Sequence, residues 1–298
     1  MIASGTLTTT ISNGIATLTF GHPASNSFPK ALLQQLTTAI QEVSTNDAVQ
    51  VVVLQSEGTG VFCAGASFDE LLAVSTEAEG AIFFSGFAHV INAMRACPKV
   101  IIGRIQGKAI GGGVGIAAAC DYTLATRQAS IKLSELAIGI GPFVIEPAVS
   151  RKIGKMAMSQ MTLAAQEWKS AEWAQQQGLY AATFETLPEL DEAVQKMATQ
   201  LAGYNPQALL EIKKVFWKGT DHWATLLLER AAISGQLVLS DFTINALLQK
   251  VDVAKKIAQA PDKSYEIGVV IGSYLPFVVL VGFAYWMYYR AKKRDENR

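Results

Sequence analysis

A run of three glycines places the tightest limit on how this chain can fold. The segment 105–115, with the sequence IQGKAIGGGVG, follows the apolar run 100–102 and leads into the small residues 116–119. This order predicts a strand, a glycine turn and the start of a helix. Glycine allows close approach of a ligand to the backbone, and a helix N-terminus presents free N–H groups and a positive dipole end. Such a turn can hold an oxyanion.

A second turn of small residues lies upstream in the sequence. The segment 62–66, FCAGA, follows the strand-like run 51–54 and precedes an apolar helical pattern. Two N–H donors from separate turns suit a thioester oxyanion hole, because one donor alone leaves much of the charge of an enolate unsatisfied. The pair of turns is therefore more informative than either turn alone.

Three sequence blocks carry a family resemblance. The blocks FCAGASFDEL, PKVIIGRIQGKAIGGGVGIAAACD and IKLSELAIGI resemble the signature segments of the crotonase (enoyl-CoA hydratase/isomerase) family, in matching order over roughly residues 5–258. The resemblance implies an α/β fold, a crotonase-like ββα spiral with a helical C-terminal trimerisation region. It also implies an acyl-CoA substrate, a homotrimer or hexamer, and no metal or redox cofactor, with coenzyme A entering only as part of the substrate.

The same resemblance assigns backbone roles near the two turns. The N–H groups of Ala66 and Gly112 would be the oxyanion donors, and Ala64, Gly65 and Ala66 would line the adenine pocket of coenzyme A. Small residues suit that pocket because they permit close backbone contact. The paired lysines 213 and 214 offer either a phosphate contact or a solvated helix face.

Glu135 is the main candidate for acid–base chemistry. It follows a strand-like stretch and is surrounded by apolar residues in KLSELAIGI. A carboxyl group in apolar surroundings has a raised pKa, which suits a group that donates and accepts a proton near neutral pH. By resemblance, Glu135 matches one of the two catalytic glutamates of enoyl-CoA hydratases.

The other hydratase glutamate would fall at Gly115, so it is missing here. Adding water to a double bond needs two acid–base groups, whereas moving a double bond needs one. Yet the loop 138–147 resembles that of methylglutaconyl-CoA and related short-acyl hydratases, and Glu146 could supply the second acid. A hydratase is slightly preferred, a Δ3-Δ2 enoyl-CoA isomerase stands next, and a membrane-tethered acyl-CoA-binding scaffold is the non-enzymatic alternative.

The glycines also fit a nucleotide-binding pattern. Residues 113–118 match the loose motif G-x-G-x-x-A, and Glu135 lies at a distance typical of a ribose ligand. A dinucleotide fold normally places this turn after its first strand, whereas two strand–helix units precede it here. The pattern therefore favours an oxyanion turn over a nucleotide turn.

Composition narrows the possible partners and compartments. The 25 basic residues balance the 25 acidic ones, so the charge gives no reason to expect nucleic acid as a partner. Three widely spaced cysteines in apolar runs, Cys63, Cys97 and Cys120, are typical of reduced, buried thiols in a cytoplasmic domain. Neither disulfides nor a cysteine-based zinc site is expected.

The C-terminus departs from this pattern. Residues 267–289 contain no charged side chain, and a helix of 23 residues would extend about 35 Å, enough to cross a hydrocarbon layer of about 30 Å. Aromatic residues crowd the end of this segment and a basic cluster, 290–294, follows it, as at a membrane interface. We expect one C-terminal transmembrane helix, with a buried core helix as the alternative. The positive-inside rule would place the basic cluster in the cytoplasm and the N-terminal domain on the opposite side of the membrane, which conflicts with a cytoplasmic domain. Either the folded cytoplasmic domain overrides this charge preference and the tail is an anchor, or the tail is foreign to the domain.

Periodicity gives the remaining elements. A hairpin is predicted around Asn13–Gly14, and no pattern places residues 71–94. Three regions are expected: a ββα-spiral core at 1–200, a helical region at 201–260, and a linker, membrane span and basic tail at 261–298. The predicted strands are 51–54, 100–102, 122–126 and 129–133, with another after Gly178. The predicted helices are 26–43, 157–163, 170–177, 190–203, 206–217 and 225–250.

Overall fold

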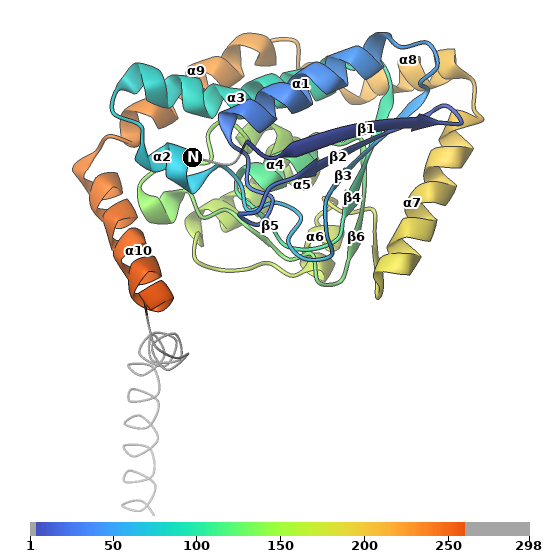
Figure 1. Ribbon diagram of the computed structural model, residues 1–298. Coiled ribbons are helices and arrows are strands. Elements are labelled where there is room, and N and C mark those ends of the chain that lie inside the picture. The colour runs from blue at the N-terminus through green and yellow to red at the C-terminus, as the bar shows by residue number, and fades with distance from the viewer. Residues whose placement is uncertain (1–3, 260–298) are drawn as a thin grey trace, which may run out of the picture. The chain divides into compact units, whose positions relative to one another are not determined.

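The computed structural model describes residues 4–259, and a six-stranded sheet forms its centre (Figure 1). The strands lie in the order β1-β2-β3-β4-β6-β8. Only the first pair is antiparallel; the other neighbours run parallel. Their bounds are β1 (Thr6–Ser12), β2 (Ile15–Gly21), β3 (Val51–Ser56), β4 (Val100–Ile105), β6 (Tyr122–Thr126) and β8 (Ala182–Phe184).

The hairpin predicted from Asn13–Gly14 is confirmed. Asn13 and Gly14 both have positive φ angles, 50° and 77°, which a two-residue turn between twisted antiparallel strands requires. Ser12 pairs with Ile15 directly across this turn. The turn therefore fixes the register of the first two strands.

Helices cover both faces of the sheet. Val51 and Val53 pack with α7 (Leu187–Ala202), while Val52 and Leu54 pack on the opposite face with the core that includes α1 (Lys30–Thr45), α3 (Glu77–Ala96) and α4 (Gly112–Ala119). Because β3 is buried on both faces, it begins with a continuous apolar run in the sequence, residues 51–54. The α/β prediction is confirmed.

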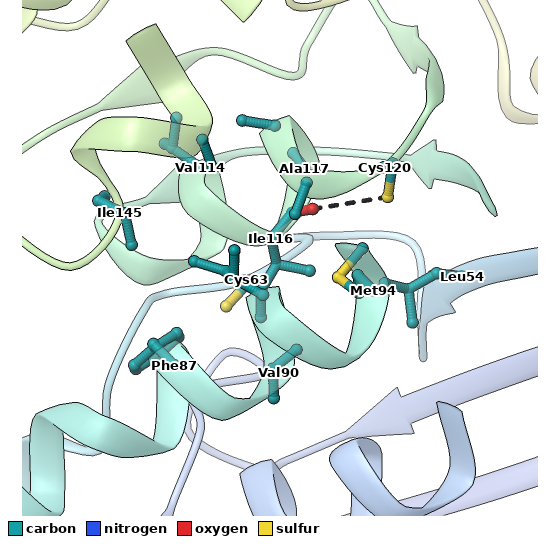
Figure 2. Packing of buried hydrophobic residues seen from close by; sticks show 14 of the residues in the cluster. Leu54, Cys63, Phe87, Val90, Met94, Val114, Ile116, Ala117, Cys120 and Ile145 are labelled. Atoms are coloured by element: carbon teal, nitrogen blue, oxygen red, sulfur yellow. Dashed lines mark hydrogen bonds between the residues drawn. The ribbon is translucent and has the colours of Figure 1, made fainter. Parts of the chain in front are cut away.

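The short helix α4 is the most deeply buried helix near the predicted site. Figure 2 shows Ile116 of this helix pointing toward Val90 and Met94 of α3, and Cys120 Sγ at the end of the helix donates to the Ile116 carbonyl at 3.5 Å. Cys63, Cys97 and Cys120 are buried free thiols, as predicted. Burial raises the pKa of both Cys63 and Cys120 to about 12, so both stay protonated.

A small second sheet brings the two predicted turns together. Strands β5 (Ala109–Ile110) and β7 (Ile131–Lys132) pair in parallel. A further bridge joins Cys63 to Ala109, which places the segment 62–66 alongside the strand that leads into the glycine run.

Helices dominate the second half of the chain, with one difference from prediction. The single helix expected over 225–250 is wrong: α9 (Trp223–Leu237) and α10 (Asp241–Gln259) are separate, and Ser240 accepts a hydrogen bond from the Thr243 N–H at 3.3 Å. A serine followed by an acidic residue starts a new helix. The other elements are α2 (Phe68–Leu72), η1 (Leu136–Ile138), α5 (Glu146–Leu163), α6 (Ala171–Gln176) and α8 (Pro206–Phe216).

The predicted transmembrane segment 267–289 lies outside the described residues. Within residues 4–259, no single helix combines the length and apolar composition of a membrane span. One helix pair, Trp223–Leu237 with Asp241–Val251, meets both criteria jointly but is bent by 74°. The chain also divides into two compact units between Ile244 and Asn245, and the candidate site residues all belong to the first unit.

Candidate active site

The first turn is held by backbone hydrogen bonds on both sides. The Phe28 N–H donates to the Gly65 carbonyl at 2.8 Å, and the Ile110 N–H donates to the Cys63 carbonyl at 2.9 Å. Gly65 has a φ angle of 89°, which favours glycine. Within residues 4–259, no acceptor contacts the N–H of half-buried Ala66.

The second turn starts helix α4. Gly111 has a φ angle of 52°, and its N–H donates to the Lys132 carbonyl at 2.9 Å. The next N–H, that of Gly112, is the first of the helix and has no acceptor among the described residues. The helix therefore points a free donor and its positive end at this position.

The two turns touch each other. A Cβ atom placed on Gly65 would lie 3.6 Å from the Gly112 nitrogen and 3.0 Å from the Ile110 carbonyl oxygen. The structure thus brings Ala64, Gly65, Ala66 and Gly112, all predicted from sequence, into one place. Each of these adjoining turns has one N–H group without an acceptor among the described residues, at Ala66 and at Gly112, and an oxyanion site would need two such donors.

Phe87 of α3 covers the start of helix α4. A Cβ atom on Gly112 would lie 2.2 Å from Phe87 Cε1, so no side chain fits at position 112. Sequence reasoning missed Phe87 because α3 lay in the region that no pattern placed. The ring makes an apolar wall beside the free N–H of Gly112.

Glu135 places its carboxyl group at the second turn. A Cβ atom on Gly111 would lie 2.7 Å from Glu135 Oε1. The other oxygen, Oε2, is buried and has no hydrogen-bond partner among the described residues. Burial raises the pKa of this carboxyl group from 4.5 to about 7. Near neutral pH the group is therefore present in both protonation states, which suits proton transfer in both directions.

Position 115, where the resemblance would place a second glutamate, is filled from outside. A Cβ atom on Gly115 would lie 2.3 Å from Cγ2 and 2.6 Å from Cβ of Ile145. Ile145 is 3% exposed and belongs to the loop that follows Glu135. An apolar side chain therefore occupies the place of a second acid, and no local sequence pattern signals this contact.

The Glu146 side chain forms an ion pair within the protein. Its Oε2 forms an ion pair with Nη1 of Arg230 on α9, and Ser150 Oγ donates to its Oε1 at 2.5 Å. Arg230 Nη1 also donates to the Phe143 carbonyl at 3.3 Å. The sequence could not show this pairing because Arg230 lies 84 residues away.

The structure also decides between the alternatives for the nucleotide-like motif at 113–118 and for the paired lysines 213 and 214. Gly113 and Gly115 lie inside α4, and a Cβ on Gly113 would meet Cys63 at 2.7 Å, so the nucleotide motif forms no phosphate-binding turn. Lys213 is not on a solvated face: it is buried and pairs with Asp121 at 2.9 Å, whereas Lys214 pairs with Glu211 at the surface.

Comparison with known proteins agrees with this geometry. Residues 10–234 match the family model of enoyl-CoA hydratase/isomerase. A Bacillus subtilis protein named "Probable enoyl-CoA hydratase" is 26% identical over 204 residues, covering 68% of this chain and 78% of that protein. Human mitochondrial methylglutaconyl-CoA hydratase is 35% identical over 117 residues, but these span only 39% of this chain and 34% of the human protein.

A solved structure shows the same fold. Enoyl-CoA hydratase from Bacillus halodurans superposes with a TM-score of 0.76 at 22% identity, covering 82% of this chain and 99% of that one. The fold and the paired turns thus define a crotonase-type α/β protein. The chain belongs to the enoyl-CoA hydratase/isomerase family.

Proposed function

We propose that this protein moves a double bond within an enoyl-CoA thioester, from the 3,4 to the 2,3 position. The N–H groups of Ala66 and Gly112 would bind the thioester oxygen, and Glu135 would carry the proton. The observation that supports a single-acid reaction most strongly is the contact of Ile145 with Gly115, because it leaves no room for a second carboxylate there.

The proposed reaction needs one base that returns its own proton. The Glu135 carboxylate removes a proton from C2, and the C2–H electrons form the enolate, whose oxygen accepts hydrogen bonds from the two backbone donors. The same carboxyl group then gives the proton to C4 while the enolate collapses to the conjugated 2-enoyl thioester. A pKa of about 7 suits both halves of this cycle.

Hydration is the second candidate. The printed names of the Bacillus subtilis and human relatives favour it, as does the resemblance of the loop 138–147 to that of short-acyl hydratases. In that case Glu146 would have to leave Arg230 to activate water. We rank hydration below isomerisation for this reason, which reverses the slight preference drawn from sequence.

The test uses the full-length chain with two substrates supplied separately. With 3-hexenoyl-CoA we expect the conjugated-enoyl absorbance to rise while the product mass stays constant. With crotonyl-CoA we expect no gain of water. Loss of conjugation from crotonyl-CoA with addition of water would instead establish a hydratase, and no change with either thioester would leave another acyl group or a binding scaffold.

Replacing Glu135 by Ala separates an enzyme from a scaffold. An enzyme should lose turnover by a factor of about 10² or more, since general acid–base catalysis contributes at least that much. A non-catalytic scaffold should keep its affinity for the same thioester. Both quantities can be measured on one preparation.

We also propose an oligomeric state and a membrane anchor for this protein. The family resemblance suggests a homotrimer or a pair of trimers, which light scattering of the full-length chain would measure. The uncharged segment 267–289 suggests a membrane anchor. Membrane fractionation of the full chain against a version ending at Ala258 tests the anchor, and an equal distribution of the two forms would exclude it.

A further inference from the structure

Strand β1 forms one free edge of the central sheet. It stands at the end of the strand order, so only β2 pairs with it (Figure 1). All of its residues except Leu7 are exposed. Proteins usually protect such an edge with a charged residue, a proline, a bulge or a very short strand. The sequence of β1, TLTTTIS, has no charge and no proline over 7 residues, and its register with β2 is unbroken. The edge is therefore open to another strand.

The hairpin turn determines which backbone groups face this free edge. A two-residue turn with two positive φ angles closes on a hydrogen-bonded pair, which here is Ser12 and Ile15. Hydrogen-bonded and non-hydrogen-bonded pairs alternate along an antiparallel ladder, so every second residue back from Ser12 bonds to β2. The residues between them turn their N–H and C=O groups outward, and no partner for these groups lies within residues 4–259. The outward residues are Leu7, Thr9 and Ile11.

The sequence of β1 reads nearly the same in both directions. If two copies lie antiparallel with Thr9 opposite Thr9, Leu7 of each copy lies opposite Ile11 of the other. Thr8 of each copy then lies opposite Thr10 of the other. Apolar residues thus meet apolar residues and threonines meet threonines, and such cross-strand pairs stabilise antiparallel sheets. A shift by two residues would leave an outward residue unpaired, so the register centred on Thr9 is the one that pairs them all.

The surroundings of the edge also suit a symmetric contact. A two-fold axis brings identical residues together, so a strand that carries charges would meet its own charges. β1 has none, and the β2 residues that pair with Thr8 and Thr10 are threonines as well. On the other face, Leu7 packs against the core, whereas Ile11 is 45% exposed. Pairing with a second β1 would cover this exposed apolar side chain.

We propose that β1 pairs antiparallel with β1 of a second copy of this chain, around a two-fold axis at Thr9, and so joins the two central sheets into one. The outward residues of each copy bond to those of the other, and each hydrogen-bonded pair of residues exchanges two N–H···O bonds. The contact is independent of the reaction proposed above. Because it is two-fold, it doubles whatever assembly the rest of the chain forms.

The first test traps the contact with a disulfide. In the proposed register the two Thr9 Cα atoms lie about 5.5 Å apart, within the range of about 4.4–6.8 Å that a disulfide spans. Full-length Thr9→Cys, oxidised with copper phenanthroline, should therefore run as a covalent dimer on a non-reducing gel. Thr8→Cys is the matched control and should stay monomeric on this gel, since its two copies would lie about 7–8 Å apart. The native cysteines are buried and do not compete.

The second test measures mass. Sedimentation equilibrium of the full-length protein, in a detergent matched to the density of the solvent, gives the mass of the protein alone. Thr9→Lys places two equal charges at the axis and should halve the mass of the parent. Thr9→Val keeps the main-chain groups and should leave the mass unchanged. Thr199→Lys, at an exposed threonine of α7, is the matched control and should also leave the mass unchanged.

Two results would overturn the pairing. One is an equal mass for the parent and Thr9→Lys, and the other is equal cross-linking of Thr8→Cys and Thr9→Cys. Melting temperatures of the variants control for folding. Neither experiment uses a thioester, so a failure of the pairing can be told apart from a failure of the proposed reaction.

Discussion

At the scale of single residues, the burial that suits Glu135 to proton transfer also lowers the stability of the folded protein. Its carboxyl group has a pKa of about 7 in the folded protein and an ordinary value near 4.5 when unfolded. The unfolded chain therefore loses this proton first as pH rises, and folding stability falls between about pH 4.5 and 7. Above that range the full cost is present, on the order of 3 kcal/mol.

Replacing Glu135 by Gln removes the charge that burial opposes. The variant should melt above the parent protein at pH 8 and at the same temperature as the parent at pH 4, where both forms are neutral. Its turnover should fall by about 10² or more. Thermal melts at both pH values, run beside the enoyl-CoA assay, check the two effects together, and a lower melting point at pH 8 would contradict the assigned burial cost.

Gly115 offers a second test at this scale. Gly115→Ala should destabilise the protein by about 1–3 kcal/mol, because the new Cβ meets Ile145 in a filled core. Helix propensity alone would favour alanine by about 1 kcal/mol, so the sign of the change reports the contact. The matched control is Gly60→Ala, where a Cβ would meet nothing within 4 Å. Urea denaturation of both variants measures the difference.

At the scale of elements, the sequence predicted those helices, strands and turns that depend on residues close together in the chain. The hairpin at Asn13–Gly14 and the apolar strand β3 follow from turn chemistry and from burial on both sides. The contact of Gly65 with Gly112 was expected only through the family resemblance, since it depends on pairing between distant segments. Neither Ile145 above Gly115 nor the pairing of Glu146 with Arg230 has a local signature.

The loop between Glu135 and α5 is fixed at both ends. Near its start, the Glu135 carbonyl accepts hydrogen bonds from the Ile138 and Ile140 N–H groups, at 3.1 and 3.0 Å. Near its end, Arg230 holds the Glu146 carboxylate and the Phe143 carbonyl. We expect this arrangement to hold the loop in place after Glu135 and so to help maintain the burial that raises the pKa of its carboxyl group.

Breaking the Arg230 contact should therefore change the pH dependence of catalysis. In Arg230→Met, water should reach Glu135, and its pKa should fall from about 7 toward 4.5. Since proton abstraction needs the carboxylate, the rise of kcat with pH should move to lower pH by about one unit or more. A pH–rate profile of the full-length enzyme measures this shift.

Two variants control the loop experiment. Glu146→Gln removes the same ion pair from its other side and should move the profile in the same direction. Arg127→Met removes an exposed pair with Glu185, which is 60% exposed, and should leave the profile unchanged. A profile that does not move in Arg230→Met would show that this ion pair does not keep Glu135 dry.

At the scale of the whole molecule, a buried ion pair connects distant parts of the chain to the end of α4. Asp121 follows this helix and accepts hydrogen bonds from the Ile101 N–H at 2.8 Å and from Trp217 Nε1 at 2.7 Å. Lys213 of α8 pairs with Asp121 and donates to the Lys99 carbonyl at 2.7 Å. Both charged side chains are 3% exposed, so each depends on the other.

Removing one partner should be far more costly than losing a surface pair. Lys213→Met removes the ion-pair partner of the buried Asp121 carboxylate, leaving only the charge interactions with Arg151 and Lys152, and should lower the free energy of unfolding by about 3–5 kcal/mol. Lys214→Met, one residue along the same helix, breaks only the exposed pair with Glu211 and should change it by less than about 1 kcal/mol. Urea denaturation of the two variants isolates the effect of burial, because the residue change is identical. Equal losses would mean that water reaches Asp121 and that α8 is not anchored through this pair.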